Sequence, residues 1–461
     1  MAENILDRIA ESKRAEIAVR LDGVSLNALR ARARPTTRSL ADAVARAGSR
    51  FILEIKKNSP SAGAIRPGAD VAALARGYAG VGDALSVLTD GPFFGGSVED
   101  LAIARRNFAG PILAKDFFLD VRQVAQARIA GADAIIVILA LVDDAVAREL
   151  IAEARRFGMD ALVEVHDEVE MRRANALGAQ IIGINNRDLR DLRIDLRTTE
   201  RLASLAGGRV LIAESGIATG ADIERLSRHV DAFLVGSSLM KTDQPAQAAR
   251  DLLFGKVKLC GLRRVEDLDC AAPASFAGFV FVPASPRHVT AEQAAPLAGR
   301  ARRSGILPVG VFRDAPLCVV SDLAHLLNLH AVQLHGEEDE VYVRRLRREL
   351  DGHCEVWTAV AVRNGKTEFR GGDRTLFDSG PGGTGRCFDW NLIRDNARLP
   401  KALVAGGIGA ANARAAAAVG AYAIDVGSAT DRAPGIKLPA KIRALFEELR
   451  APSRQEYRLC A

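Results

Sequence analysis

The sequence predicts an α/β protein made of two tandem (β/α)8 TIM barrels with a helical extension at its N-terminus. Apolar runs alternate with helical stretches along almost the whole chain, which is typical of parallel strands covered by helices. A strand–turn–helix–strand unit with Gly-Ile and Gly-Ser turns occurs twice, at 210–240 and again at 402–430. The length of 461 residues accommodates two barrels of roughly 200–250 residues each.

Residues 1–47 are predicted to form the helical extension. Apolar residues recur there at near-helical spacing, at Ile5, Leu6, Ile9, Ile17 and Leu21. A second helical stretch covers 39–47. The N-terminus lacks the apolar core of a signal peptide, and the longest apolar run, 134–142, is too short to span a bilayer. We therefore expect a cytoplasmic protein.

Eight apolar runs predict the strands of the first barrel: 51–56, 84–88, 111–115, 134–139, 161–165, 181–185, 210–214 and 232–236. Charged or amide side chains stand near the carboxyl ends of five of them, at Glu54, Lys56, Lys115, Glu164, Asn185 and Glu214. Any one of these would pass as a solvated boundary residue. Together in one barrel mouth, lysines and carboxylates would shift each other's pKa values, as general acid–base catalysis requires.

Eight further runs predict the second barrel: 256–260, 278–282, 307–312, 331–335, 355–362, 375–378, 402–406 and 423–427. Here the strand ends carry Cys260, His335 and Asp378, and Arg287 follows the second strand. A thiol acts as a base only when ionised, and we expect the nearby cations Lys258 and Arg287 to lower its pKa. His335 is equally compatible with a structural role.

The repeated unit predicts a phosphate site in each barrel. Gly216 and Gly236 are 20 residues apart, as are Gly407 and Gly427. Glycine turns after strands 7 and 8 present free backbone N–H groups to a phosphate. A requirement for tight turns alone would also explain any single glycine. The Gly-rich segment 378–389 lacks the Gly-Lys-Ser/Thr ending of a P-loop and is expected to be a loop that closes over substrate.

Charge and cysteine content argue against other classes of function. The 63 basic and 57 acidic residues are interspersed, with a net charge of +6, so nothing indicates nucleic-acid binding. The six cysteines are scattered without zinc-site spacing, and no metal site is expected.

Residues 1–254 resemble indole-3-glycerol-phosphate synthase, through the motifs ILEIKKNSPSAG, ALSVLTD with FFGGS, PILAKDF, GINNRDL and AESGI. That family closes an indole ring on 1-(2-carboxyphenylamino)-1-deoxyribulose 5-phosphate, with loss of carbon dioxide and water. The resemblance implies that Lys115 is the general acid, that Glu164 assists dehydration, and that Lys56 binds the anthranilate carboxylate or is a second acid.

The same resemblance implies roles for the remaining residues of this mouth. Glu54, Asn185, Glu214 and Ser215 orient substrate hydroxyls and the lysines. The phosphate lies on Gly216, Gly236 and Ser237, near Ser59. Arg187 also contacts substrate, and Phe93 and Phe117 wall the aromatic ring, although plain loop packing would explain both rings. The family uses its N-terminal extension as a lid.

Residues 256 to about 450 resemble phosphoribosylanthranilate isomerase, through KLCGLRR, FVFVPASPRHV, GVFRD, VQLHGEED, LFDSGPGGTGRCFDW and AGGI with DVGSA. That family converts an aminoaldose to an aminoketose. The resemblance implies Cys260 as the base at C2, Asp378 as the acid that opens the ribose ring, and Arg287 as the partner of the anthranilate carboxylate. His335 contacts substrate, and the phosphate lies on Gly406, Gly407, Gly427 and Ser428.

The two implied reactions are consecutive, so the chain resembles a bifunctional enzyme of tryptophan biosynthesis that needs no metal or organic cofactor. With no flexible linker near Gly255, we expect two abutting barrels, 1–254 and 255–461, in a monomer. Two alternatives stay open at this point. One is Schiff-base chemistry at Lys115 or Lys56, and the other is a protein that binds a phosphometabolite without turning it over.

Overall fold

A computed structural model describes residues 5–61, 63–189, 191–362, 369–380 and 385–459. The chain forms two compact units, Met1–Ala249 with Ala451–Ala461, and Arg250–Arg450. The C-terminal residues thus pack within the first unit, which no sequence pattern indicated. The predicted boundary between residues 254 and 255 lies at the end of α12 (Pro245–Phe254), the helix in which the two units divide.

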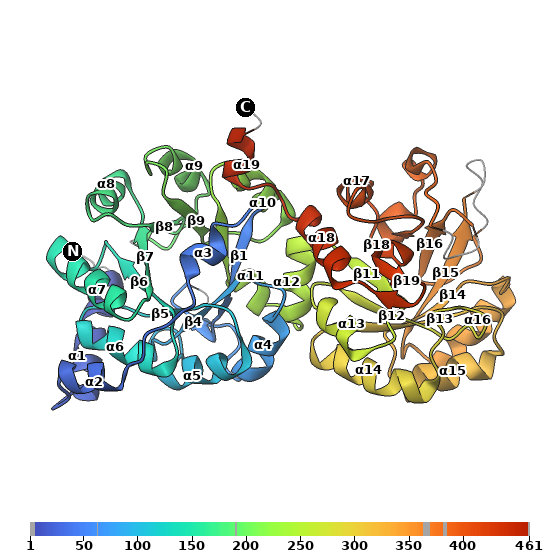
Figure 1. The fold of residues 1–461 in the computed structure, drawn as a ribbon, viewed down its shortest axis with the longest axis horizontal. Coiled ribbons are helices and arrows are strands. Elements are labelled where there is room, and N and C mark those ends of the chain that lie inside the picture. The colour runs from blue at the N-terminus through green and yellow to red at the C-terminus, as the bar shows by residue number, and fades with distance from the viewer. Residues whose placement is uncertain (1–4, 62, 190, 363–368, 381–384, 460–461) are drawn as a thin grey trace. The chain divides into compact units, whose positions relative to one another are not determined.

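The first unit contains a closed barrel of eight parallel strands, which confirms the predicted fold (Figure 1). Its strands are β1 Arg50–Ile55, β4 Ala84–Leu88, β5 Ile112–Lys115, β6 Ala134–Ile138, β7 Asp160–Val165, β8 Ile181–Asn185, β9 Val210–Glu214 and β10 Ala232–Val235. A two-stranded sheet, β2 Asn58–Ser59 with β3 Gly63–Ala64, follows β1.

Helices surround this barrel, and three of them form the predicted N-terminal extension. The extension consists of α1 Ile5–Arg20, α2 Leu26–Arg32 and α3 Leu40–Val44. The others are α4 Val71–Tyr78, α5 Val98–Asn107, α6 Val121–Ala130, α7 Asp144–Arg156, α8 Glu168–Ala176, α9 Arg197–Ala203, α10 Gly220–Ser227, α11 Ser237–Met240 and, near the C-terminus, α19 Arg454–Leu459. Side chains of Ser97, Asp143 and Asp167 cap α5, α7 and α8, so these βα junctions begin helices with favoured N-cap residues.

The second unit is also a closed barrel of eight parallel strands. Its strands are β11 Val257–Cys260, β12 Phe276–Val280, β13 Leu307–Phe312, β14 Ala331–Leu334, β15 Glu355–Ala361, β16 Arg374–Asp378, β17 Leu403–Val404 and β18 Ala423–Val426. A short antiparallel pair follows, β19 Asp431–Ala433 with β20 Ile436–Lys437. The helices are α13 Val265–Cys270, α14 Ala291–Arg303, α15 Leu317–Leu326, α16 Glu340–Leu350, α17 Ala413–Ala417 and α18 Pro439–Leu449, with 3-10 turns η1 Trp390–Ile393, η2 Leu399–Lys401 and η3 Ser428–Thr430.

Two predicted strands of the second barrel differ from the structure by more than one residue at an end. β12 begins two residues before the predicted run, at Phe276, because Ser275 already donates its N–H to Val257 O. A shift of two residues leaves the inward face unchanged. β17 is shorter than predicted because Gly406 and Gly407 have φ of +89° and +60°, which ends the extended conformation.

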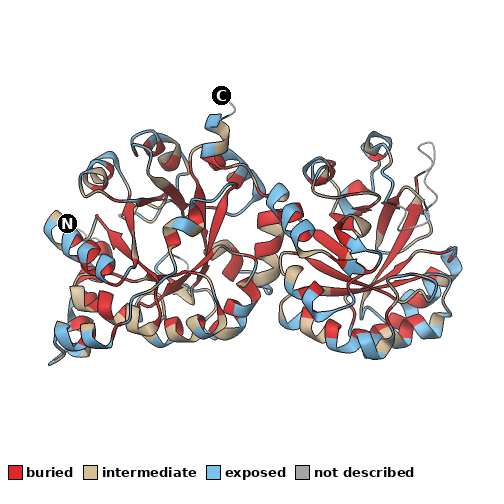
Figure 2. Ribbon diagram, viewed as in Figure 1, coloured by how far each residue is buried: buried red, intermediate tan, exposed pale blue. Residues whose placement is uncertain are grey.

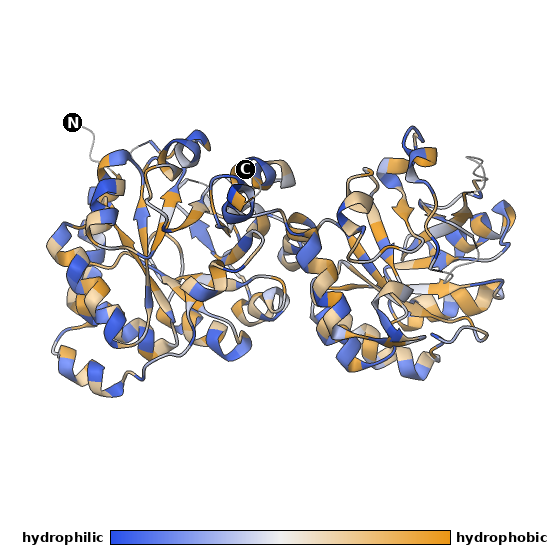
Figure 3. Ribbon diagram, turned by 45° about the horizontal axis from the view of Figure 1, so that its top comes forward, coloured by the Kyte–Doolittle hydropathy of each residue, from blue (hydrophilic) through white to orange (hydrophobic). Residues whose placement is uncertain are grey.

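The strands of both barrels are buried and largely hydrophobic, as the burial colours of Figure 2 and the hydropathy colours of Figure 3 show. Phe51 and Phe233 stack with ring centroids 5.5 Å apart in the first barrel. Phe276 meets Trp357 edge-on at 5.3 Å in the second. Within the described residues, no helix is long and apolar enough to cross a bilayer.

Candidate active sites

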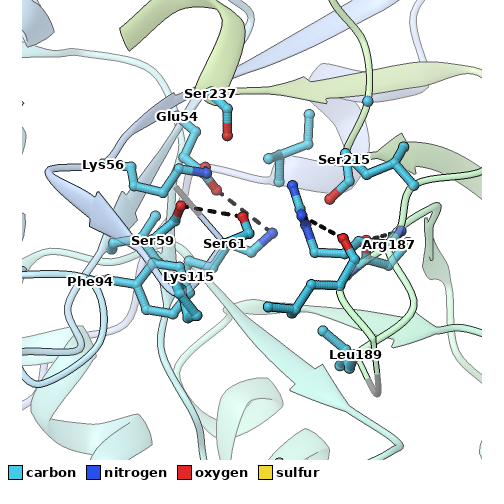
Figure 4. Close-up of a pocket in the computed structure, with 18 of the residues that line it drawn as sticks. Glu54, Lys56, Ser59, Ser61, Phe94, Lys115, Arg187, Leu189, Ser215 and Ser237 are labelled. Atoms are coloured by element: carbon cyan, nitrogen blue, oxygen red, sulfur yellow. Dashed lines mark hydrogen bonds and ion pairs between the residues drawn. The ribbon is translucent and has the colours of Figure 1, made fainter. Parts of the chain in front are cut away.

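The mouth of the first barrel contains a cavity of about 480 Å³. The residues predicted from the strand ends meet there, and Figure 4 shows several of them pointing toward one another. Predicted residues along the cavity wall are Glu54, Lys56, Ser59, Lys115, Phe117, Glu164, Asn185, Arg187, Ser215, Gly216, Gly236 and Ser237. Glu214 lies directly behind the wall, fully buried against Lys115.

Lys115 is the centre of a charged cluster. Its Nζ lies 2.5 Å from Glu214 Oε2, 3.7 Å from Glu54 Oε2 and 3.9 Å from Glu164 Oε2. Lys56 Nζ lies 2.6 Å from the other oxygen of Glu54. One carboxylate therefore orients both lysines.

The cluster separates the pKa values of its members. Burial disfavours the Lys115 ammonium, but the charges of Glu214, Glu54 and Glu164 more than compensate and raise its pKa. Burial raises the pKa of Glu214 to about 7 despite the charge of Lys115. Lys115 thus stays protonated at neutral pH, while Glu214 changes its protonation state near neutral pH.

His166, which the sequence patterns did not single out, pairs with Glu164. Its Nε2 lies 3.2 Å from Glu164 Oε1, and its Nδ1 lies 3.0 Å from Glu170 Oε2. Burial works against the imidazolium, but the two glutamates raise the His166 pKa to about 10. Burial likewise opposes ionisation of Glu164, yet the hydrogen bond from His166 and the charge of Lys115 lower its pKa to about 2. Asn185 Nδ2 also donates to Glu164 Oε1 at 3.1 Å.

Two glycines make room for the buried carboxylates. A Cβ atom on Gly183 of β8 would collide with Glu214 Oε1, and one on Gly236 would collide with Glu54 Oε1. Gly236 has φ of −139°, a value that other residues also adopt. The space occupied by the Glu54 side chain therefore explains why this position is a glycine.

Aromatic rings line one side of the cavity. Phe94 and Phe117 lie with centroids 6.0 Å apart, and both are at the cavity wall. Phe93 does not line the cavity; its N–H donates to Asp90 Oδ2 at 2.9 Å. Neighbouring residues in a turn point in different directions, so the FF pair contributes Phe94 in place of the predicted Phe93.

Polar backbone groups gather at the opposite side. Ser215 and Gly216 have φ of +64° and +84° after β9, and Gly236 precedes α11. The first N–H groups of a helix have no partner within that helix. They are available here to an anion beside the hydroxyl of Ser237.

Ser59 of β2 and Arg187, in the segment after β8, both line this cavity. Ser59 is buried at 7% exposure, with its hydroxyl 3.5 Å from that of Ser61. Arg187 donates from Nη1 to Leu192 O at 2.9 Å, and burial lowers the pKa of its guanidinium.

The mouth of the second barrel contains a cavity of about 360 Å³. All residues predicted for this site line it: Cys260, Arg287, His335, Asp378, Gly406, Gly407, Gly427 and Ser428. Residues 381–384 of the predicted closing loop are outside the described residues.

Cys260 does not have the lowered pKa that the neighbouring cations led us to expect. Burial raises its pKa, and the charge of Lys258 reduces that effect without reversing it. The reason is that Lys258 Nζ lies 2.9 Å from Asp425 Oδ2, which offsets its positive charge. The raised pKa favours the neutral thiol.

Asp378 and His335 lie together at the strand ends β16 and β14. His335 Nε2 lies 3.6 Å from Asp378 Oδ2, and Asp378 Oδ1 accepts the N–H of Ser379 at 2.6 Å. A Cβ atom on Gly406 would lie 3.2 Å from Asp378 Oδ1 and 2.8 Å from Arg386 O. Glycine thus lets this turn approach the carboxylate closely.

Arg287 is held by Asp431, a residue that the sequence patterns missed. Arg287 donates from Nη2 and Nε to Asp431 Oδ2 at 2.7 and 3.0 Å. Lys437 binds the other Asp431 oxygen at 2.8 Å and also donates to Gly427 O at 2.8 Å. A Cβ atom on Gly261 would lie only 2.5 Å from Arg287 Cδ.

Family comparisons match both halves. The model of indole-3-glycerol phosphate synthase matches residues 6–252, and that of N-(5'-phosphoribosyl)anthranilate isomerase matches residues 257–448. Tryptophan biosynthesis protein TrpCF of Salmonella typhi is 40% identical over 97% of this chain and 100% of that protein. TrpCF of Yersinia pestis is 42% identical over 87% of this chain and 84% of that protein.

Among solved structures, phosphoribosyl anthranilate isomerase from Thermus thermophilus aligns at 30% identity and a TM-score of 0.39, covering 42% of this chain and 98% of that chain. The family models and the near full-length relatives confirm the resemblance of both halves. The chain belongs to the family of bifunctional tryptophan-biosynthesis enzymes that join an indole-3-glycerol phosphate synthase to a phosphoribosylanthranilate isomerase.

Proposed function

We propose that each cavity is the site of one of these two activities and that they act in series. The second barrel isomerises N-(5-phosphoribosyl)anthranilate to 1-(2-carboxyphenylamino)-1-deoxyribulose 5-phosphate, and the first converts that ketose to indole-3-glycerol phosphate. The observation that carries the assignment is the pairing of groups. One cavity holds an ammonium among three carboxylates, and the other holds a thiol and a carboxylate.

In the isomerase cavity, Asp378 protonates the ribose ring oxygen, and the C1–O bond breaks to leave an iminium between C1 and nitrogen. The iminium cation favours ionisation of Cys260, which burial opposes, and the thiol loses its own proton to solvent. The thiolate then removes the proton from C2, and the resulting enol becomes the ketone by losing its hydroxyl proton and taking up a proton at C1. Arg287, oriented by Asp431, binds the anthranilate carboxylate.

In the synthase cavity, Lys115 donates its proton to the ribulose carbonyl as the aryl carbon attacks it. The carboxylate then leaves as carbon dioxide and returns its electron pair to the ring. Loss of the hydroxyl from C2 of the former ribulose as water needs a proton donor for the hydroxyl. It also needs a base that takes a proton from the adjacent C1. Glu164, kept ionised by His166, acts as that base, and Lys56 either binds the anthranilate carboxylate or supplies the second proton.

The phosphate of each substrate lies on the glycine turns after the seventh and eighth strands. In the synthase these are at Gly216, Gly236 and Ser237, with Ser59 nearby; in the isomerase they are at Gly406, Gly407, Gly427 and Ser428. Ser215, Arg187 and His335 contact the remaining parts of the substrates. Phe117 and Phe94 flank the aromatic ring.

Schiff-base chemistry at Lys115 is disfavoured by the same cluster. An amine attacks a carbonyl only when it is neutral, so a nucleophilic lysine needs a lowered pKa. The carboxylates around Lys115 raise its pKa instead. Borohydride added during turnover should therefore trap no covalent adduct.

The direct test is to supply phosphoribosylanthranilate to the purified chain and follow both products. The ketose should appear first and indole-3-glycerol phosphate after it. Tight binding of phosphoribosylanthranilate without either product would identify a binding protein and overturn the proposal.

We also propose a monomer in the cytoplasm, with the activities divided near Gly255. Each cavity is lined by residues of a single unit, and the cysteines that the structure describes are free thiols, as in a reducing compartment. The measured mass of the protein in solution tests the monomer, and cell fractionation tests the location.

A further inference from the structure

Lys13 of α1 is an almost fully buried ammonium outside the charged cluster of the first cavity, with 1% of its surface exposed. Its Nζ lies 2.8 Å from Asp90 Oδ1, 2.8 Å from Asp116 Oδ1 and 2.6 Å from Glu16 Oε2. Asp90 and Asp116 are themselves almost fully buried, at 1% and 6% exposure. No step assigned above uses this group.

The two aspartates belong to the loops that carry the synthase site. Asp116 follows Lys115 directly, and it accepts hydrogen bonds from the Thr89 hydroxyl at 2.7 Å and the Phe117 N–H at 2.8 Å. Asp90 accepts the Phe93 N–H at 2.9 Å, which shapes the turn that presents Phe94 to the cavity. Lys13 therefore joins the loops after β4 and β5.

The same helix covers the cavity. Ile5, Leu6 and Ile9 of α1 line it, one to two turns before Lys13 on the same face. We call these three residues the roof. The ion pairs of Lys13, one turn after Ile9, fix the position of α1 along its axis and its rotation about that axis. Apolar contacts of the roof are less directional and would restrain both less strongly.

We propose that Lys13 is a positioning residue of the synthase, which ties the roof to the loops bearing Lys115 and the cavity phenylalanines and so sets the affinity for the aromatic part of the substrate. This rests on the synthase activity proposed for the first cavity. Without the ammonium, two buried carboxylates repel each other and draw water, and the roof separates from the loops. Chemistry at Lys115 does not require Lys13 to touch substrate.

The test uses the full-length chain with Lys13→Met, which keeps the apolar stem and removes the charge. We expect KM for the ketose to rise about tenfold or more with kcat changed less than about threefold. The milder Asp90→Asn should raise KM by a smaller factor. Lys13→Met combined with Asp90→Asn should recover part of the loss, because one of the repelling charges is gone.

Arg14→Met is the matched control, since Arg14 is the exposed neighbour on the same helix, and it should behave as wild type. Isomerase rates in each variant report on the integrity of the second unit. An unchanged KM in Lys13→Met, a fall in kcat without a rise in KM, or a double variant worse than the single one would overturn the proposal. A wild-type chain that makes no indole-3-glycerol phosphate would instead overturn the synthase assignment.

Discussion

In the first barrel two lysines face the cavity, whereas in the second two lysines lie behind its wall. Lys115 and Lys56 line the synthase cavity among carboxylates. Lys258 and Lys437 are buried at 0% and 2% exposure, each paired with an aspartate. In the proposed mechanism the synthase lysines give protons to substrate, whereas Lys258 influences the ionisation of Cys260 and Lys437 helps to hold Asp431, the partner of Arg287. The two barrels thus differ in where they place their lysines, although the guanidinium of Arg287 still lines the second cavity.

Replacing Lys115 with Met should have the largest effect. Synthase activity on the ketose should fall by about 10³-fold or more, because the general acid and its charge at the reacting carbonyl are both lost. Isomerase activity should remain normal, since its cavity belongs to the other unit. Loss of both activities in a folded Lys115→Met protein would contradict separate sites.

Cys260→Ala should give the converse result. Removal of the base should lower isomerase kcat by about 10²- to 10⁴-fold, with synthase activity on supplied ketose unchanged. Cys260→Ser keeps the size but not the acidity of the thiol and should be nearly as slow. Near-normal isomerisation in Cys260→Ala would remove the thiol from the mechanism.

His166→Gln should have an intermediate effect on the synthase. Glu164 then loses the imidazolium that helps to lower its pKa, while burial still raises that pKa. We expect kcat to fall about tenfold and, in a Glu214→Gln background that removes the limb near pH 7, the acidic limb of the pH profile to move toward neutral pH. A lower kcat with an unmoved pH profile would mean that His166 only supports the fold.

Glu214 should dominate the pH dependence of the wild-type synthase near neutrality. Its pKa is raised to about 7, and only the ionised form pairs with the Lys115 ammonium. Activity should therefore rise as pH increases through about 7. Glu214→Gln should flatten this limb, and an identical limb in that variant would assign it to another group.

The C-terminal residues should affect stability more than catalysis. Arg454 Nη2 lies 2.9 Å from the buried Asp231 Oδ2, and Ala451 O accepts the Ser49 N–H at 2.8 Å. Ending the chain after Arg450 removes the ion-pair partner of Asp231, which keeps the hydrogen bond from the Leu211 N–H, and should destabilise the first unit by about 3 kcal/mol. Calorimetry should show a lower Tm for one transition only, with isomerase rates unchanged. Two equally shifted transitions would contradict this assignment.

A cut near Gly255 tests the proposed division of activities. The second piece should retain isomerase activity, and the first should retain synthase activity with the reduced stability of the truncated chain. Adding back a peptide of residues 451–461 should restore part of that stability. An insoluble second piece would show that the division lies elsewhere.

Strand-end patterns predicted both barrels, and most of the residues that they single out line the two cavities. Period-two alternation identifies an inward side chain such as Glu54 or Cys260, because a barrel strand has only one interior face. His166 fits the same alternation two residues after Glu164, and extending the pattern past the strand end would have found it. Phe94, and not the predicted Phe93, lines the cavity because of the backbone conformation of the turn that carries both residues. Strand and helix periodicities do not describe the side-chain directions in such a turn.

Other features depend on contacts distant in sequence. The pairing of Lys13 with Asp90 and Asp116, and that of Arg454 with Asp231, join residues tens to hundreds of positions apart. The pKa of Cys260 depends on a balance between the burial of the thiol and the charges of the Lys258–Asp425 pair. A sequence shows which residues are charged but not how deeply the thiol is buried. The sequence predicts Gly236 as part of a phosphate-binding turn, and the structure shows that a larger side chain at this position would collide with the Glu54 carboxylate.

The central claim is that two separate cavities perform consecutive reactions, and a mixing experiment tests it most directly. Lys115→Met supplied with phosphoribosylanthranilate should accumulate the ketose, and Cys260→Ala alone should form neither product. The two variants mixed should make indole-3-glycerol phosphate, because the ketose from one chain reaches the synthase cavity of the other. No indole-3-glycerol phosphate from the mixture, with both variants folded and the ketose present, would contradict the account.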